Sequence, residues 1–157
     1  MIEVEVEVED EAWLEALPEV EALVSRAVRA ALDGEGEGAV TVLLADDEAI
    51  AELNARFRGR HSATNVLSFP AAQTAAPHLG DIALALGVCS AEAVAQSKPL
   101  AHHLQHLVAH GALHLVGFDH QSDDEAEVME ALERKYLAPV SKVNVHALDR
   151  SNHGLAE

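Results

Sequence analysis

The chain has little cysteine and no long hydrophobic run. Cys89 is its one cysteine, so no disulfide can form within the chain, and we expect a small buried apolar residue in a reducing cytosol. No apolar stretch approaches the roughly 20 residues that span a membrane. The first residues, Met1 to Glu5, lack the basic start and apolar core of a secretory signal. These absences predict a cytoplasmic protein with no membrane association.

Basic side chains are also scarce. The chain has 10 Lys and Arg against 27 Asp and Glu, a formal net charge of −17. This balance argues against generic nucleic-acid binding, because attraction to phosphates depends on Lys and Arg. The charge is uneven, however. Arg56, Arg58 and Arg60 alternate, and between Leu53 and Ile82 the only acid is Asp81. A local positive patch is therefore compatible with an acidic protein.

Hydrophobic periodicity and length predict one domain that contains both strands and helices. At 157 residues, a single core can bury about two-thirds of the unfolded surface. Alternating or short apolar runs predict strands at 2–8, 39–45, 66–69 and 81–86. Helical spacing and capping residues predict helices at 17–32, 47–57, 90–96, 99–116 and 123–136. We expect a single domain over residues 1–138 and a weakly patterned tail over residues 139–157.

The strongest functional signal is the segment HGALHLVGFDH at residues 110–120. His110 and His114 are four apart, so in a helix they share one face. Gly117 predicts the end of that helix, because glycine enters the left-handed conformation at little cost. The chain can then turn back and bring His120 to the same point. Three imidazoles suit a tetrahedral zinc with water in the fourth position, so we predict one Zn²⁺ per chain.

Other histidines offer a competing set of ligands. His106, His110 and His114 follow one another at four-residue spacing, but they span roughly 12 Å along a helix, which is too far for one ion with bonds near 2 Å. We expect His106 to face the core or to support a ligand, and His102 and His103 to lie at the surface. Two alternatives stay open: unrelated roles for the histidines of the segment, and a closed structural zinc site with a distant fourth ligand.

The segment lacks the base of a zinc peptidase. Peptidases with the same His and Gly spacing carry Glu directly after the first His as general base. Here that position is Gly111, so a different hydrolysis is the better inference and a peptidase or amidase is the alternative. Asp119 could act as the base or accept a hydrogen bond from a zinc-bound imidazole. We favour the second role, because the neighbour of a ligand reaches the bound water poorly.

Four further motifs accompany the histidine segment, in an order shared with a known family. They are Leu53-Asn54, Phe57-Arg58, Thr64 to Pro70 and Leu79 to Ile82. With them the chain resembles the YbeY endoribonucleases, also called rRNA maturation factors. The resemblance implies an α+β fold with a small mixed sheet packed with helices, and a metal-bearing helix and turn like those of zinc peptidases.

The same resemblance implies an activity and its partners. It implies a metal-dependent hydrolase that cleaves single-stranded RNA, matures the 3′ end of small-subunit rRNA and acts in ribosome quality control. The expected partners are rRNA and the ribosomal small subunit with its proteins. The metal ligands implied are the three histidines of the segment. A different class also stays open, a zinc-stabilised ribosome-assembly protein that binds partners through its acidic surface and cuts little.

Arg58 matches the family's functionally important arginine. A guanidinium can hold two oxygens of a phosphorane as negative charge builds there, whether water or the RNA 2′-hydroxyl attacks. The alternative is a surface arginine at a helix end. Arg56 could steer phosphates or only aid solubility. Asn65 and Ser68 could present amide and hydroxyl groups to RNA, or they could pin the edge of a strand. Phe57 stands where many members of the family have Tyr.

Overall fold

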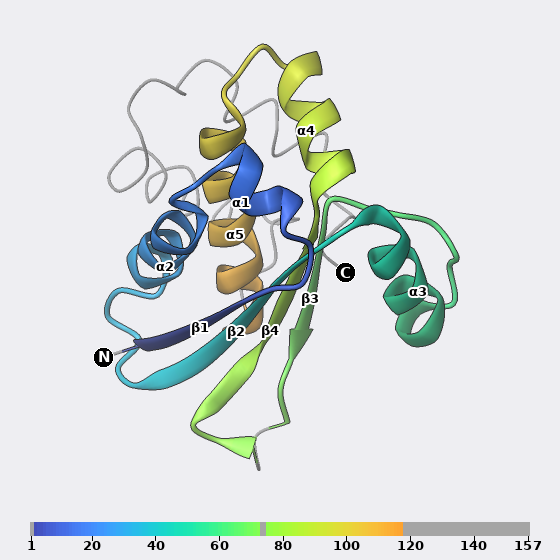
Figure 1. The fold of residues 1–157 in the computed structure, drawn as a ribbon. Coiled ribbons are helices and arrows are strands. Elements are labelled where there is room, and N and C mark those ends of the chain that lie inside the picture. The colour runs from blue at the N-terminus through green and yellow to red at the C-terminus, as the bar shows by residue number, and fades with distance from the viewer. Residues whose placement is uncertain (1, 73–74, 118–157) are drawn as a thin grey trace.

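A mixed four-stranded sheet lies at the centre of the computed structural model, which describes residues 2–72 and 75–117 (Figure 1). Its strands are β1 (Ile2–Val8), β2 (Gly38–Ala45), β3 (Val66–Pro70) and β4 (His78–Ala85). They lie side by side in the order β1-β2-β4-β3. Strands β1, β2 and β4 are parallel to one another, whereas β3 runs antiparallel to β4. The predicted α+β fold with one small mixed sheet is therefore confirmed.

Helices cover the two faces of this sheet unequally. The described helices are α1 (Ala12–Ala16), α2 (Val20–Ala31), α3 (Asp47–Arg58), α4 (Leu86–Ala95) and α5 (Leu100–Leu115). Helices α2 and α5 pack against one face, whereas α3 lies on the other (Figure 1). Among the described residues, no helix has both the length and the apolar character needed to cross a membrane.

Side-chain alternation along the strands produces two hydrophobic clusters. The larger cluster joins one face of the sheet to α2 and α5, and its members include Val40, Val42, Leu44, Ile82, Leu84, Val24, Val28, Leu104 and Leu107. The smaller cluster lies under α3 and consists of Ala45, Ile50, Leu67, Ala83 and Ala85. Cys89 is buried in the larger cluster, and this burial raises the pKa of its thiol. Cys89 is therefore an unreactive packing residue, as the sequence predicts.

Three strands follow the sequence pattern closely, whereas β4 begins at His78 rather than at Asp81 and two helices also differ from the pattern. Helix α1 was not predicted, and it is anchored by Trp13, which is fully buried and donates from Nε1 to the Ala45 carbonyl at 2.9 Å. Helix α4 begins at Leu86 rather than near Ser90. The predicted helix at 123–136 and the tail after residue 138 lie outside the described residues.

Local signals define both ends of α3. The Asp46 side chain accepts a hydrogen bond from the Ala49 amide at 2.8 Å, as a helix N-cap does. Gly59 ends the helix in the left-handed conformation, with φ of 74°. These two signals place Phe57 and Arg58 in the last turn of α3, where the chain leaves the helix and turns towards β3.

Candidate active site

Helix α5 carries two of the three predicted metal ligands. His110 is buried and His114 half-buried, and Nδ1 of His114 is shielded from solvent with no hydrogen-bond partner in the described part of the chain. Two imidazoles one turn apart, one with such a nitrogen, fit the donor set of a zinc site. His120 and Asp119 lie outside the described residues, within which no group of three ligating side chains occurs. The three-histidine site therefore stays a prediction.

The end of α5 has the conformation that the sequence predicts. Helix α5 ends at Leu115, and the Gly117 amide donates to the His114 carbonyl at 3.1 Å. Gly117 has φ of 101°, a value that glycine adopts readily and other residues rarely. Helix α5 therefore ends directly after the second predicted ligand.

His106 lies one turn before His110 and faces the core, as the sequence predicts. Their ring centroids are 6.3 Å apart. Burial lowers the pKa of His106 well below its ordinary value, and the nearby charges of Lys98 and His103 lower it further. The imidazole of His106 is consequently neutral at physiological pH. A neutral neighbour adds no charge that would oppose a cation at His110.

The predicted surface position of His103 is wrong. Its side chain is fully buried, and Nε2 lies 2.8 Å from Oε1 of Glu92 on α4. The same Glu92 oxygen accepts a hydrogen bond from Asn65 Nδ2 at 3.0 Å. The reason is that α4 packs against the side of α5 that the sequence pattern assigned to solvent. His102 is half-buried, and desolvation lowers its pKa.

Gly111 lets α5 approach the sheet closely. A Cβ atom at this position would lie 2.9 Å from Ser68 Oγ and 3.2 Å from Ile82 Cγ2. Ser68 Oγ also donates to the Gly111 carbonyl at 3.3 Å. The position that holds the catalytic Glu in zinc peptidases thus faces packed side chains of β3 and β4. Neither the sequence nor the space available supports a carboxylate base here.

Arg58 binds the edge of β3 that faces away from β4. The pairings of Asn65 with Ala85 and of Ala71 with Leu79 place the backbone of Ser68 on the edge away from β4, because bonding groups alternate along an antiparallel strand. Arg58 Nη2 donates to the Ser68 carbonyl there at 2.7 Å.

Phe69 completes the surroundings of Arg58. The Arg58 guanidinium carbon lies 5.4 Å from the centroid of the Phe69 ring, within the range of a cation–π contact. Phe69 carried no separate signal in the sequence beyond its place in the Thr64 to Pro70 motif. Its role depends on how α3 and β3 meet.

Asn65 and Ser68 are fully buried. Asn65 Oδ1 accepts from the Val66 amide at 2.7 Å, and Asn65 Nδ2 reaches Glu92. Of the two roles expected for these residues, the buried contacts fit the pinning of the strand. Ser68 also joins the two parts of the site, since its carbonyl binds Arg58 while its hydroxyl binds the Gly111 carbonyl of α5.

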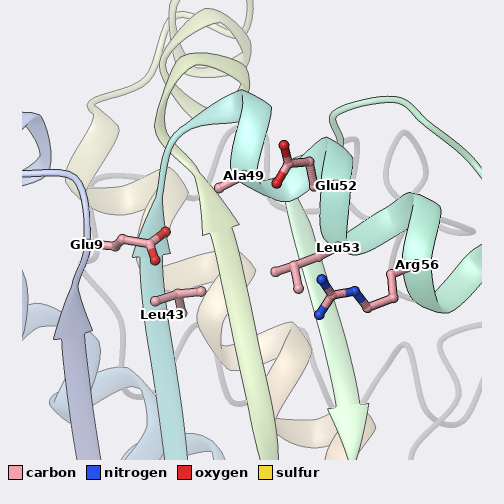
Figure 2. Close-up of a pocket in the computed structure, with 6 residues that line it drawn as sticks. All are labelled: Glu9, Leu43, Ala49, Glu52, Leu53 and Arg56. Carbon is pink, nitrogen blue, oxygen red and sulfur yellow. The ribbon is translucent and has the colours of Figure 1, made fainter.

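A shallow groove between α3 and the sheet lies beside Arg56. Figure 2 shows its lining residues, which are Glu9, Leu43, Ala49, Glu52, Leu53 and Arg56. The groove thus contains two carboxylates, of Glu9 and Glu52, and one guanidinium, of Arg56. Because the carboxylates repel a phosphate, the groove is a poor site for an anionic ligand. Arg56 lines this groove, and its guanidinium carbon also lies 5.9 Å from the centroid of the Phe57 ring.

The chain is similar in sequence and in fold to known proteins. Residues 5–141 match the family model described as Endoribonuclease YbeY. Endoribonuclease YbeY of Maricaulis maris is 56% identical over 134 residues, which cover 83% of each chain. Endoribonuclease YbeY of Azorhizobium caulinodans is 46% identical over 156 residues, covering 94% of this chain and 98% of the relative. The solution structure of TM1509 from Thermotoga maritima matches with a TM-score of 0.56 and 25% identity, covering 100% of this chain and 97% of the other.

Proposed function

Since this chain belongs to the Endoribonuclease YbeY family, we propose that it is a zinc-dependent endoribonuclease that cuts single-stranded RNA. Its substrate in this proposal is rRNA, at the 3′ end of the small-subunit RNA, and its activity serves rRNA maturation and ribosome quality control in the cytoplasm. The observation that carries the proposal is the link through Ser68 between Arg58 and the helix of His110 and His114.

The chemistry divides between the predicted metal ligands and Arg58. A zinc ion bound by His110, His114 and His120 would supply a Lewis acid and a water of lowered pKa. Arg58 then offers its guanidinium to the oxygens of the phosphorane, where negative charge develops. The Ser68 carbonyl and the Phe69 ring hold this side chain before the substrate arrives. Such preorganisation reduces the conformational entropy lost when RNA binds.

The acidic surface supports the proposed ribosomal partners. The outward residues of β1 are Glu3, Glu5 and Glu7, and all three are exposed. These carboxylates are complementary to basic ribosomal proteins and repel bare RNA. The small subunit and its proteins would accordingly contact the β1 side of the sheet, while RNA would approach the arginines of α3.

The decisive experiment compares cleavage of a single-stranded fragment of the rRNA 3′ end by the parent protein and by Arg58→Ala. We expect the rate to fall on the order of 10²-fold or more, as when a single donor to a developing oxyanion is removed. Arg58→Lys should restore only part of the rate, because an ammonium lacks the forked geometry. Arg60→Ala is the matched control, since Arg60 is exposed just beyond α3 and its loss changes the charge equally.

All four proteins would be compared at equal zinc content and similar melting temperature. Normal cutting by Arg58→Ala would contradict the phosphate role. No cutting by the zinc-loaded parent, together with retained binding to the small subunit, would favour the ribosome-assembly alternative.

A further inference from the structure

Two of the chain's three phenylalanines meet at the end of α3, in a protein with only 3% aromatic residues. The rings of Phe57 and Phe69 have centroids 5.4 Å apart and an interplanar angle of 61°, an edge-to-face contact. Arg56 lies over the Phe57 ring at 5.9 Å, and Arg58 lies over the Phe69 ring at 5.4 Å. We call these four side chains the aromatic platform.

Phe57 does not behave as a core residue. It remains 60% exposed, whereas Phe69 is half-buried. Burial of a phenylalanine side chain stabilises a fold, and most of that gain is absent for so exposed a ring. The contact with Phe69 nevertheless restrains its orientation. The platform thus presents an exposed apolar ring to solvent.

The charges around the platform favour an anionic ligand with a flat apolar part. Arg56 and Arg58 flank the rings in a protein whose net charge is −17. Nucleotides in a single strand combine an aromatic base with a phosphate. Proteins that bind single strands use the same combination of stacking aromatic side chains and nearby cations. Bases within a duplex already stack on one another, so their faces are not accessible to such a surface.

We propose that the aromatic platform stacks one unpaired nucleobase of the RNA substrate on Phe57, while Arg56 and Arg58 contact the adjacent phosphates. This inference rests on the proposed function and adds a physical basis for single-strand selectivity. Strand β3 relates the platform to the predicted chemistry. Phe69 faces α3, the neighbouring Ser68 hydroxyl faces Gly111 of α5, and Arg58 lies on the strand edge between them. An RNA strand that crosses this edge of β3 would extend from the platform towards α5.

The test measures binding of a fluorescent single-stranded RNA to zinc-loaded protein by anisotropy, with gels of the same samples to confirm intact RNA. Phe57→Ala should weaken binding at least about five-fold, the lower end for one stacked base. It should leave the salt dependence unchanged, because it removes no charge. Phe57→Trp should bind at least as tightly as the parent. Val94→Ala on α4 is the matched control, since Val94 is an apolar side chain that is 80% exposed.

A second set of strands separates stacking from simple hydrophobic contact. Each strand carries one abasic nucleotide at a different position. For the parent protein, an abasic nucleotide at one of these positions should lower the RNA affinity about as much as Phe57→Ala does. When this strand is combined with Phe57→Ala, the two losses of affinity should not add. In Phe57→Trp, RNA should quench the new exposed indole, while Trp13 is fully buried and serves as an internal reference.

The outcomes distinguish this inference from the proposed function. Equal RNA affinity of the parent and Phe57→Ala, with the parent still cutting RNA, would overturn the stacking site and leave the nuclease proposal intact. Additive losses from Phe57→Ala and every abasic strand would also overturn it. A parent that neither binds nor cuts single-stranded RNA would overturn both.

Discussion

Replacing Gly111 by Ala should destabilise the protein, although the same change stabilises an ordinary helix. Alanine is favoured over glycine by about 1 kcal/mol in a helix interior. In α5, however, the new Cβ would lie 2.9 Å from Ser68 Oγ and 3.2 Å from Ile82 Cγ2. The hydroxyl of Ser68 would have to turn away from the Gly111 carbonyl, and Ile82 would have to shift.

The magnitude follows from these contacts. A buried hydroxyl that loses its partner costs about 1–3 kcal/mol, and Ser68 is fully buried. Crowding of a packed core typically costs about 1–3 kcal/mol more. After subtraction of the helix preference, we expect a net loss of about 3 kcal/mol in the free energy of unfolding. For a chain of this length that loss lowers the melting temperature by about 6–12 °C.

Urea denaturation followed by circular dichroism would measure this loss in the metal-free protein, so that zinc binding does not contribute. The Ser68→Ala background provides a double-mutant cycle. There the hydroxyl is absent, and Gly111→Ala should cost at least about 1 kcal/mol less than in the parent. A Gly111→Ala protein as stable as the parent would refute the close packing of α5 on β3 and β4. So would strict additivity in the cycle.

Two further predictions concern histidines of the chain. Burial lowers the folded-state pKa of His106. The contribution of neutral His106 to stability is therefore complete above the unfolded pKa of about 6.5. This contribution is lost as the pH falls below that value, at up to about 1.4 kcal/mol per pH unit. His106→Leu should therefore reduce the loss of stability between pH 7 and 5.5 in metal-free urea titrations, and an unchanged loss would contradict the depressed pKa. His114→Ala should abolish stoichiometric zinc measured by atomic emission, whereas the exposed His61→Ala should retain it; full zinc in His114→Ala would exclude the proposed ligand set.

Features set by neighbours in sequence could be predicted, and features set by distant residues could not. The alternation of β1 and the capping of α3 by Asp46 involve contacts within a few residues, and both are visible in the chain. The start of α4 was missed because no capping side chain stands beside it. Its Val88 amide donates instead to Asp47 at 3.1 Å, and Asp47 is far away in sequence.

The candidate site shows the same division. The placement of His110 and His114 on one face follows from helix geometry, and the end of α5 follows from the conformational freedom of Gly117. The burial of His103 depends on the packing of α4 against α5, which no local pattern reports. The contact of Arg58 with Phe69 likewise depends on how the end of α3 meets β3. The resemblance identified Arg58, but only the tertiary structure shows what holds its side chain.

The hydrogen bond from Arg58 of α3 to the edge of β3 also bears on the solubility of the protein. Among the described residues, strands β1 and β3 are the two edges of the sheet, and an uncovered edge invites pairing with another copy of the chain. Glutamates protect β1, whereas Arg58 covers the outward Ser68 carbonyl of β3 and Pro70 offers no amide hydrogen. Arg58→Ala would uncover this carbonyl, so its loss should increase self-association at high concentration. The arginine proposed to bind RNA would thus also hinder edge-to-edge pairing of two copies of the chain.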